Sequence, residues 1–359
     1  MAQRRPPRGV KRRRRGERGE SLEGVATPRS SDCTMKLPPL PPALAQRAGA
    51  LAVALALAAT TPSLPALAVD ASTLNEAELK AMSARNVKLP PGNGAAERAF
   101  ASGVELAAKA QDADTQTRDV AMLRRADEKL SLLVDDLAPE YVGGYTNRAN
   151  VRVALGDLDA AVADYNRAYE LAPLAPDAWI VLLNRGSTLL AQGRTDLALA
   201  DMQAAVRLGK SDKIALLGRG SVYHAMRNWE AAAADYGAVC SKEGMDVQPF
   251  WLRYSLELLQ LGRQKDALGI ARRVATKFDL EPEVQVAVGA LQLAGGTDQD
   301  RTLALQQWRG VPASVKQRAV EFDLKGREWP PAALDAAAAF LTAVAPEGTS
   351  GPDVPFSRL

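Results

Sequence analysis

The sequence predicts an all-α protein in which pairs of helices stack into a solenoid. Three observations in residues 142–278 indicate this fold: a repeat period of 34 to 37 residues, small side chains at two fixed positions of each period, and glycine at the turn between two helices. A period of this length fits one helix–turn–helix unit, and such units bury their apolar faces against their neighbours in a stack.

Four repeat units carry the pattern, and they begin at Val142, Trp179, Lys213 and Gln248. The fourth position of each unit is large and apolar: Tyr145, Leu182, Leu216 and Trp251. The eighth position is small: Ala149, Gly186, Gly220 and Ser255. The twentieth position is alanine throughout: Ala161, Ala198, Ala232 and Ala267. Because two helices approach closely only where side chains are small, we expect the eighth and twentieth positions to face each other.

The turns of three units contain glycine, at Gly156, Gly193 and Gly262. Glycine readily takes the left-handed conformation that ends a helix. The third unit has Arg227 followed by Asn228 instead, and we expect the asparagine to take the place of glycine there.

Arginine and aspartate recur sixteen residues apart in three units, as Arg148 and Asp164, Arg185 and Asp201, and Arg219 and Asp235. This spacing predicts an ion pair between the two helices of each unit. The alternative is that both side chains are solvated and recur only because the unit was duplicated, since exposed pairs contribute about 0–1 kcal/mol.

These repeats resemble those of tetratricopeptide-repeat proteins, which implies a right-handed α-solenoid that binds proteins. The clear repeats cover residues 142–278. Degenerate repeats extend the predicted solenoid to 95–310, with helices at 95–110, 118–137, 282–293 and 301–308. Capping helices at 314–324 and 331–344 are expected within residues 311–345, because the ends of a stack need a cover. A linker (69–94) and a tail (346–359) are expected to be mostly disordered.

The first 68 residues have the features of a targeting leader. They contain 12 Lys and Arg against four acidic residues, then the apolar stretch 48–59, which is too short to span a membrane. Ala66-Leu67-Ala68 matches a signal cleavage site, so we expect cleavage after Ala68. The remaining chain has 33 basic and 38 acidic residues. This balance argues against nucleic-acid binding, and we expect no transmembrane segment in the mature protein.

The basic segment before the apolar stretch resembles the bipartite transit peptides of thylakoid-lumen proteins. The chain as a whole is similar to the thylakoid-lumen tetratricopeptide proteins of plants and algae, which implies a role in assembling or maintaining a photosynthetic membrane complex. Acidic residues interrupt the leader, so a bacterial-type periplasmic or secreted adaptor that starts at Met35 is the alternative. A nuclear signal in residues 11–15 is a further interpretation of the basic run.

We expect the binding site to be a concave groove lined by the first helix of each unit, with a protein or peptide as the partner. The residues predicted to line it are Thr146, Asn147, Asn150, Leu183, Asn184, Ser187, Leu217, Ser221, His224, Leu252, Arg253 and Leu256. His224 either contacts the partner in a pH-dependent way or is only tolerated on the helix surface.

The resemblance also permits a test of the carboxylate clamp that some tetratricopeptide domains use to hold chaperone C-termini. Asn150 and Asn184 match the clamp. Thr146, Ile214 and Gly218 occupy the positions where the clamp has the lysine and arginine side chains that hold a carboxylate. We therefore expect no clamp. The alternative role for the two asparagines is bonding to neighbouring backbone.

No cofactor, metal site or catalytic motif is expected. The mature chain has one cysteine, Cys240, and one histidine, His224, which is too few for a zinc cluster. An enzyme that uses Cys240 and His224, or acidic groups in the groove, remains the alternative, and it requires the two side chains to be adjacent in space.

Overall fold

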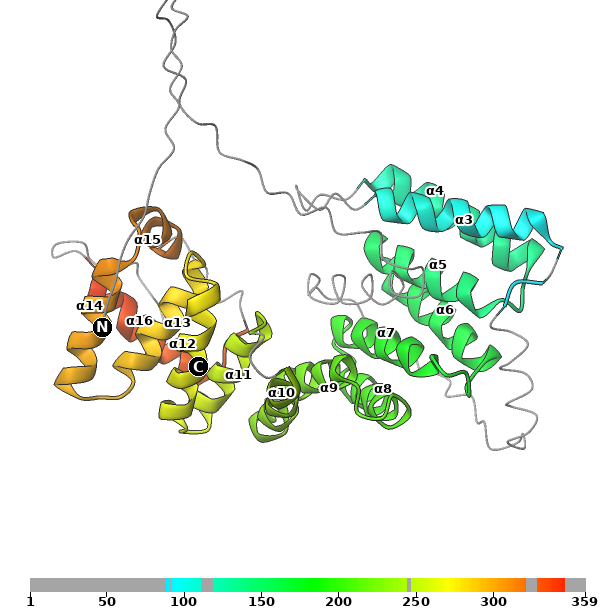
Figure 1. Cartoon of the computed structure of the whole chain (residues 1–359). Coiled ribbons are helices and arrows are strands. Elements are labelled where there is room, and N and C mark those ends of the chain that lie inside the picture. Colours follow the sequence, from blue (N-terminus) through cyan, green and yellow to red (C-terminus); the bar gives the residue numbers. More distant parts are fainter. Residues whose placement is uncertain (1–87, 91, 111–118, 244–246, 321–327, 346–359) are drawn as a thin grey trace, which may run out of the picture.

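The computed structural model of the chain describes residues 88–90, 92–110, 119–243, 247–320 and 328–345. This part of the chain is all-helical, with 14 α-helices and no β-strand, and it forms the α-solenoid that the sequence predicts. Figure 1 shows the helix pairs following one another along an arc from the cyan helices to the orange ones. The predicted leader, the predicted tail and most of the predicted linker lie outside the described residues.

Six helix pairs form the arc, and two further helices follow them. The pairs are α3 (Gly94–Lys109) with α4 (Val120–Leu132), α5 (Val142–Leu155) with α6 (Leu158–Leu171), α7 (Ala178–Ala191) with α8 (Thr195–Leu208), α9 (Lys213–Ala225) with α10 (Trp229–Glu243), α11 (Phe250–Gln260) with α12 (Gln264–Lys277), and α13 (Pro282–Leu293) with α14 (Asp298–Gly310). The last two helices are α15 (Ala313–Val320) and α16 (Pro331–Val344). A π-helical turn, Leu133–Leu137, prolongs α4.

Small side chains let the two helices of each pair approach closely, as the sequence predicts. All four alanines at the twentieth position are fully buried. A Cβ atom on Gly186 would lie 3.2 Å from the carbonyl oxygen of Ala198, and one on Gly220 would lie 2.8 Å from the ring of Tyr236. Larger residues at these positions would therefore push the helices apart.

The turn of the third unit differs from the prediction. Gly156, Gly193 and Gly262 have φ values of 84°, 73° and 73°, so they are left-handed as expected. In the third unit Arg227 takes the left-handed conformation, with φ of 58°, and the expectation for Asn228 was wrong. Asn228 instead accepts a hydrogen bond from the backbone N–H of Ala231 and so caps the start of α10.

The predicted Arg–Asp pairs are present in all three units, and each has two parallel hydrogen bonds. Arg148 donates to the two oxygens of Asp164 at 2.9 and 2.7 Å. The distances are 2.7 and 2.6 Å for Arg185 and Asp201, and 2.8 and 2.7 Å for Arg219 and Asp235. The three aspartates are buried, so the interpretation of a solvated pair was wrong. The fork of a guanidinium matches the two oxygens of a carboxylate, which explains why the pairing repeats so regularly.

The first pair belongs to a larger network that joins consecutive units. Arg148 also donates to Asp135 and Ser131 at the end of the preceding unit. Arg152 bonds both Asp164 and Asp127. Burial lowers the pKa of Arg148, but its hydrogen bonds to Asp164 and Asp135 and their charges outweigh this, so the pKa lies above its usual value. The arginine therefore stays charged and holds adjacent units together.

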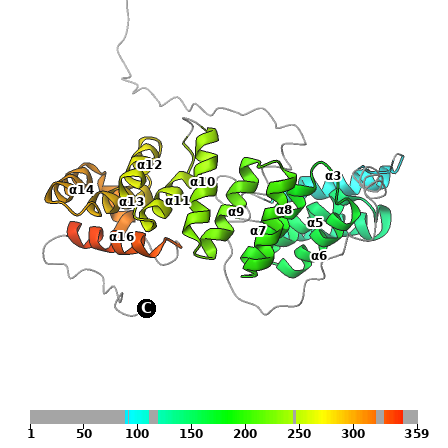
Figure 2. The ribbon, with the colours of Figure 1, turned by 90° about the horizontal axis from the view of Figure 1, so that it is seen from below.

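Helix α16 packs across the first helices of the last two units. It lies mainly against α13 and also touches α11 and α14. Figure 2 shows the red helix running alongside these elements. The indole N–H of Trp329 donates to Glu283 at 2.9 Å, and the backbone N–H of Ala332 donates to the side-chain oxygen of Gln260 at 2.8 Å. The first helices of these two units are thus covered by the chain itself.

Candidate functional site

The candidate site is the surface formed by the first helices α5, α7, α9 and α11 on the side away from their second helices. We call this surface the first-helix face. Helix α7 contacts both α5 and α9, so their outward positions form a continuous surface. The predicted groove residues all lie on these four helices. Seven of them are half-buried: Thr146, Asn147, Asn150, Ser187, Leu217, Ser221 and Arg253. Five are buried: Leu183, Asn184, His224, Leu252 and Leu256.

Asn150 and Asn184 connect the first two of the four repeat units. Tyr165 donates its hydroxyl hydrogen to Asn150 Oδ1 at 2.5 Å, and Asn184 Nδ2 lies 3.4 Å from the same oxygen. Burial, followed by the charge of Asp164, raises the pKa of Tyr165, so the phenol stays protonated and acts as a donor. Neither asparagine side chain bonds the backbone of its own helix here, so that interpretation was wrong for both residues.

A similar contact occurs at the third unit. The hydroxyl groups of Ser221 and Tyr236 are 3.4 Å apart. Burial raises the pKa of Tyr236, while Arg253 and Ser221 act in the opposite direction. Arg253 therefore brings a positive charge to this end of the first-helix face, close to two hydroxyl groups.

The remaining polar residues of the first unit bond within their own helix. Thr146 donates to the carbonyl oxygen of Val142 at 3.1 Å, and Asn147 Nδ2 donates to that of Gly143 at 2.7 Å. Both side chains remain half-buried, and the acceptor oxygen of the Asn147 amide is left for other contacts.

Three predicted groove leucines are packed inside the protein. Leu183 is 5% exposed, and a Cβ atom on Gly218 would lie 2.7 Å from its methyl carbon. Leu252 and Leu256 belong to the same buried cluster as Ala333 and Ala337 of α16. The prediction that these leucines line an open groove was wrong, because helix contacts within the chain already cover them.

The expectation for His224 was also wrong. Its ring is 5% exposed, and both ring nitrogens have partners within the chain. Nδ1 contacts a carboxylate oxygen of Glu257 on α11, and Nε2 lies 2.7 Å from the carbonyl oxygen of Glu328. Glu257 was not among the predicted site residues, although a single charged residue within the apolar run Leu256–Leu259 is a signal for a buried polar contact.

The first-helix face carries little charge. Helices α5, α7 and α9 contain no acidic residue. Arg148, Arg185 and Arg219 on these helices point away from the face, toward the aspartates of the second helices. Amides, hydroxyls and leucine side chains therefore dominate the surface, with Arg253 at one end.

The hydrogen bonds of His224 do not support the hypothetical catalytic pair with Cys240. Both nitrogens of His224 are already bonded, which leaves none to activate a thiol. Cys240 is buried on α10. Within the described residues no group of three or more His, Cys, Asp or Glu side chains could hold a metal ion.

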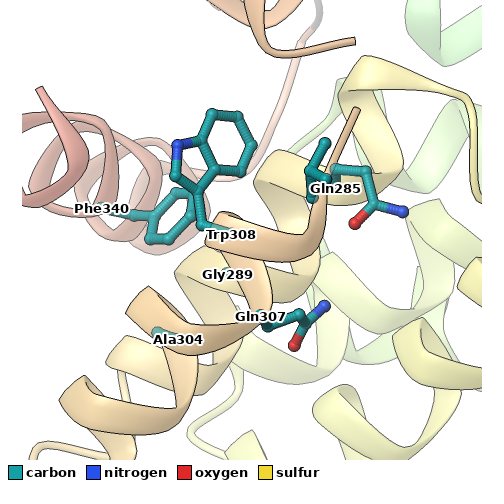
Figure 3. Close-up of a pocket in the computed structure, with 7 residues that line it drawn as sticks. Gln285, Gly289, Ala304, Gln307, Trp308 and Phe340 are labelled. Carbon is teal, nitrogen blue, oxygen red and sulfur yellow. The ribbon is translucent and has the colours of Figure 1, made fainter. Parts of the chain in front are cut away.

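A small depression near the C-terminal end has too little volume for a drug-sized ligand. Figure 3 shows its main feature, Trp308 and Phe340 meeting beside Gly289, with the two ring centroids 5.4 Å apart in an edge-to-face arrangement. Its empty space is about 140 Å³, below the roughly 300–1,000 Å³ of typical ligand sites. None of the described helices is both long and apolar enough to cross a membrane.

Comparisons with known proteins agree with the repeat architecture. The family model Tetratricopeptide repeat matches residues 142–173. Tetratricopeptide repeat protein 36 of Xenopus tropicalis is 40% identical over 74 residues, and the match spans 20% of this chain and 37% of that protein.

Solved structures show similar helix arrangements at low sequence identity. PilW, a type IV pilus biogenesis factor, is 15% identical with a TM-score of 0.49, over 63% of this chain and 99% of that one. YrrB, described as a TPR protein with an unusual peptide-binding site, is 15% identical with a TM-score of 0.44, over 55% of this chain and all of that one.

The fold and the face together define a repeat protein of the α-solenoid class. The pair α5 and α6 corresponds to the segment that matches the tetratricopeptide-repeat model. Repeats of this kind generally present a surface for other proteins.

Proposed function

We propose that the protein is a non-catalytic scaffold whose partner binds the first-helix face of α5, α7 and α9. The observation that carries this proposal is the difference between the two ends of the solenoid. Helix α16 packs on α11 and α13, whereas among the described helices α7 and α9 pack substantially only on helices of their own and neighbouring units. A partner that binds there meets an almost uncharged surface of amides, hydroxyls and leucine.

The composition of this face favours a partner segment with few charges. Asn147, Asn150, Ser187 and Ser221 offer hydrogen-bonding groups at half-buried positions, and Leu217 offers apolar area between them. A short extended peptide or a helix fits such a surface, because apolar anchors supply affinity while the amides fix its orientation. Strongly basic or acidic ligands find no complementary cluster of charges on α5 and α7.

A pair of matched substitutions tests the proposal. Leu217→Glu places a charge on the half-buried face, and Leu197→Glu places the same charge on α8, where the side chain is 40% exposed. We expect the tagged full chain and its Leu197→Glu variant to capture the same proteins from a native extract. We expect Leu217→Glu to lose them while its circular dichroism spectrum and melting temperature stay close to those of the wild type.

The proposal fails if the folded Leu217→Glu variant captures the same partners as the control. Leu183→Glu is unsuitable as a test, since Leu183 is buried against Gly218 and a charge there would unfold the unit.

For the compartment, we propose the thylakoid lumen and a role beside a photosynthetic membrane complex. The support is the two-part character of residues 1–68, with a basic segment before an apolar stretch and a cleavage site. The test is N-terminal sequencing of the native protein from a lumen fraction, and we expect Val69 as its first residue. Recovery of the native protein from the periplasm of a bacterium, with translation starting at Met35, would favour the alternative adaptor instead.

A further inference from the structure

The buried core of the solenoid is interrupted between α9 and α11. The first helices α3 and α5 contribute buried apolar side chains to one common cluster, as do α5 and α7, α7 and α9, and α11 and α13. The clustered buried residues of α9 and of α11 belong to different clusters, and among the described helices direct contact between successive first helices is weakest at this step. Apolar packing therefore does little to hold α9 and α11 together.

The second helix α10 joins the two parts of the solenoid. It packs on α11, and Figure 2 shows the two helices side by side. The ring centroids of Tyr236 and Phe250 are 6.4 Å apart, and a Cβ atom on Gly237 would lie 2.9 Å from the hydroxyl oxygen of Tyr254. Phe250 is half-buried and packs against both clusters. The close packing between the two parts therefore lies on one side of the stack, at α10.

Polar contacts of His224 cross the gap between α9 and α11. Its Nδ1 contacts a carboxylate oxygen of Glu257 on α11, and its Nε2 lies 2.7 Å from the carbonyl oxygen of Glu328, just before α16. Because a carbonyl oxygen only accepts, Nε2 carries the hydrogen of this bond, and a neutral imidazole supplies it as well as a charged one. Helix α9 is thus tied to α11 directly and, through Glu328, to the segment that leads into α16.

Residues 328–332, which we call the strap, continue from this contact to the next two first helices. The indole N–H of Trp329 donates to Glu283 of α13 at 2.9 Å, and the backbone N–H of Ala332 donates to Gln260 of α11 at 2.8 Å. Trp329 is buried in the same cluster as the apolar residues of α11 and α13. The strap therefore contacts α9 on one side of the gap and α11 and α13 on the other.

The strap begins with a backbone conformation that side chains disfavour. Glu328 has a φ of 52°, in the left-handed region that residues with a Cβ atom rarely adopt. Such a conformation persists where the surrounding contacts fix it. The side chain of Glu328 is exposed, so the bond from His224 to its carbonyl oxygen and the burial of Trp329 are the contacts that fix the strap.

We propose that the solenoid has a hinge where α10 packs on α11, and that the strap holds this hinge closed. While the strap is bonded to His224, α9 stays beside α11 and the two parts of the solenoid keep one angle. When the strap separates from α9, the part from α11 onward turns about α10 and the gap between α9 and α11 widens. The hinge changes the position of Arg253 relative to the face of α9, and it does not depend on whether a partner binds that face.

Distances between spin labels in the full chain test the hinge. Four exposed residues stand at the same position of the four repeat units: Ala163, Ala200, Ala234 and Gly269. One protein carries Ala200→Cys and Gly269→Cys, which lie on opposite sides of the gap. A second carries Ala163→Cys and Ala234→Cys, which are also two units apart but lie on the same side of it. Both carry Cys33→Ser and Cys240→Ala, so that labels attach only at the chosen positions.

His224→Leu removes both polar contacts and keeps a side chain of similar size. We expect the distribution of distances between positions 200 and 269 to widen roughly twofold or more, since the closed angle is no longer fixed. The distribution between positions 163 and 234 should stay as in the wild type. His224→Gln retains an N–H donor for the carbonyl of Glu328, so its distributions should lie closer to those of the wild type. The hinge is refuted if the folded His224→Leu protein keeps the wild-type distribution between 200 and 269, or if both distributions widen equally.

A second variant tests the strap without altering His224, because His224→Leu leaves the buried Glu257 without a partner and can unfold the unit. It combines Gln260→Ala, which removes the acceptor for Ala332, with Trp329→Phe, which keeps an aromatic ring but loses the N–H that Glu283 accepts. We expect the distances between 200 and 269 to spread and those between 163 and 234 to stay unchanged. Thr342→Ala, which removes a hydrogen bond within α16, is the control and should behave like the wild type. An unchanged distribution between 200 and 269 in the double variant would contradict the role of the strap.

Discussion

Replacing Asp164 with alanine is expected to lower the free energy of unfolding by about 3–5 kcal/mol. The side chain of Asp164 is 5% exposed and binds two guanidinium groups, those of Arg148 and Arg152. Without it, the buried Arg148 keeps a hydrogen bond to Ser131 and the ion pair with Asp135, whose side chain is 58% exposed. A guanidinium stays protonated in proteins, so Arg148 cannot relieve the loss by giving up its proton.

An exposed pair of the same chemistry is the control for this prediction. Arg263 and Asp266 form an ion pair in which both side chains are more than half exposed. Asp266→Ala should therefore change stability by about 0–1 kcal/mol. Urea unfolding of both variants gives the comparison, and hydrogen exchange in α5 and α6 locates the loss. Equal effects of the two substitutions would show that the buried network does not stabilise the solenoid.

Phe340→Ala is expected to destabilise the protein by about 3–5 kcal/mol, since it removes a fully buried ring from the C-terminal core. Gly289→Ala is expected to destabilise it by about 1–3 kcal/mol, because the new Cβ atom would lie 2.1 Å from the ring of Phe340. Urea or thermal unfolding measures both effects.

The two substitutions should also be strongly coupled. Once Phe340 is alanine, the ring no longer obstructs residue 289, and Gly289→Ala is then expected to be neutral or to stabilise α13 by up to about 1 kcal/mol through helix propensity. Leu303→Ala, which truncates a side chain that is 40% exposed, is the control and should have a small effect. If the double variant loses as much unfolding free energy as the two single variants together, the close contact between residue 289 and the Phe340 ring would be contradicted.

Most of the solenoid was predictable because its contacts are local and repeated. Ala161 and Ala198 stand at the same position of successive units, so the sequence shows their shared role without any structure. The same holds for the Arg–Asp pairs, whose sixteen-residue spacing connects the two helices of one unit. Each repeat supplies an independent copy of the same observation.

Contacts without a repeat were not predictable. His224 and Glu328 are 104 residues apart in the chain, and no period relates them. The sequence indicates which positions of a first helix face outward, but it does not show that α16 covers Leu252 and Leu256. Arg227 takes the left-handed turn although Asn228 has the higher intrinsic preference, because Asn228 is used to cap α10.

We propose above that partners bind the first-helix face of α5, α7 and α9. Site-specific photo-crosslinking in a native extract tests it most directly, with the reactive group placed at Ser187 on α7 in one protein and at the exposed Ala234 on α10 in another. We expect a crosslinked partner from position 187 and none from position 234. A partner crosslinked from position 234 but not from position 187 would contradict it and place the binding surface on the second helices.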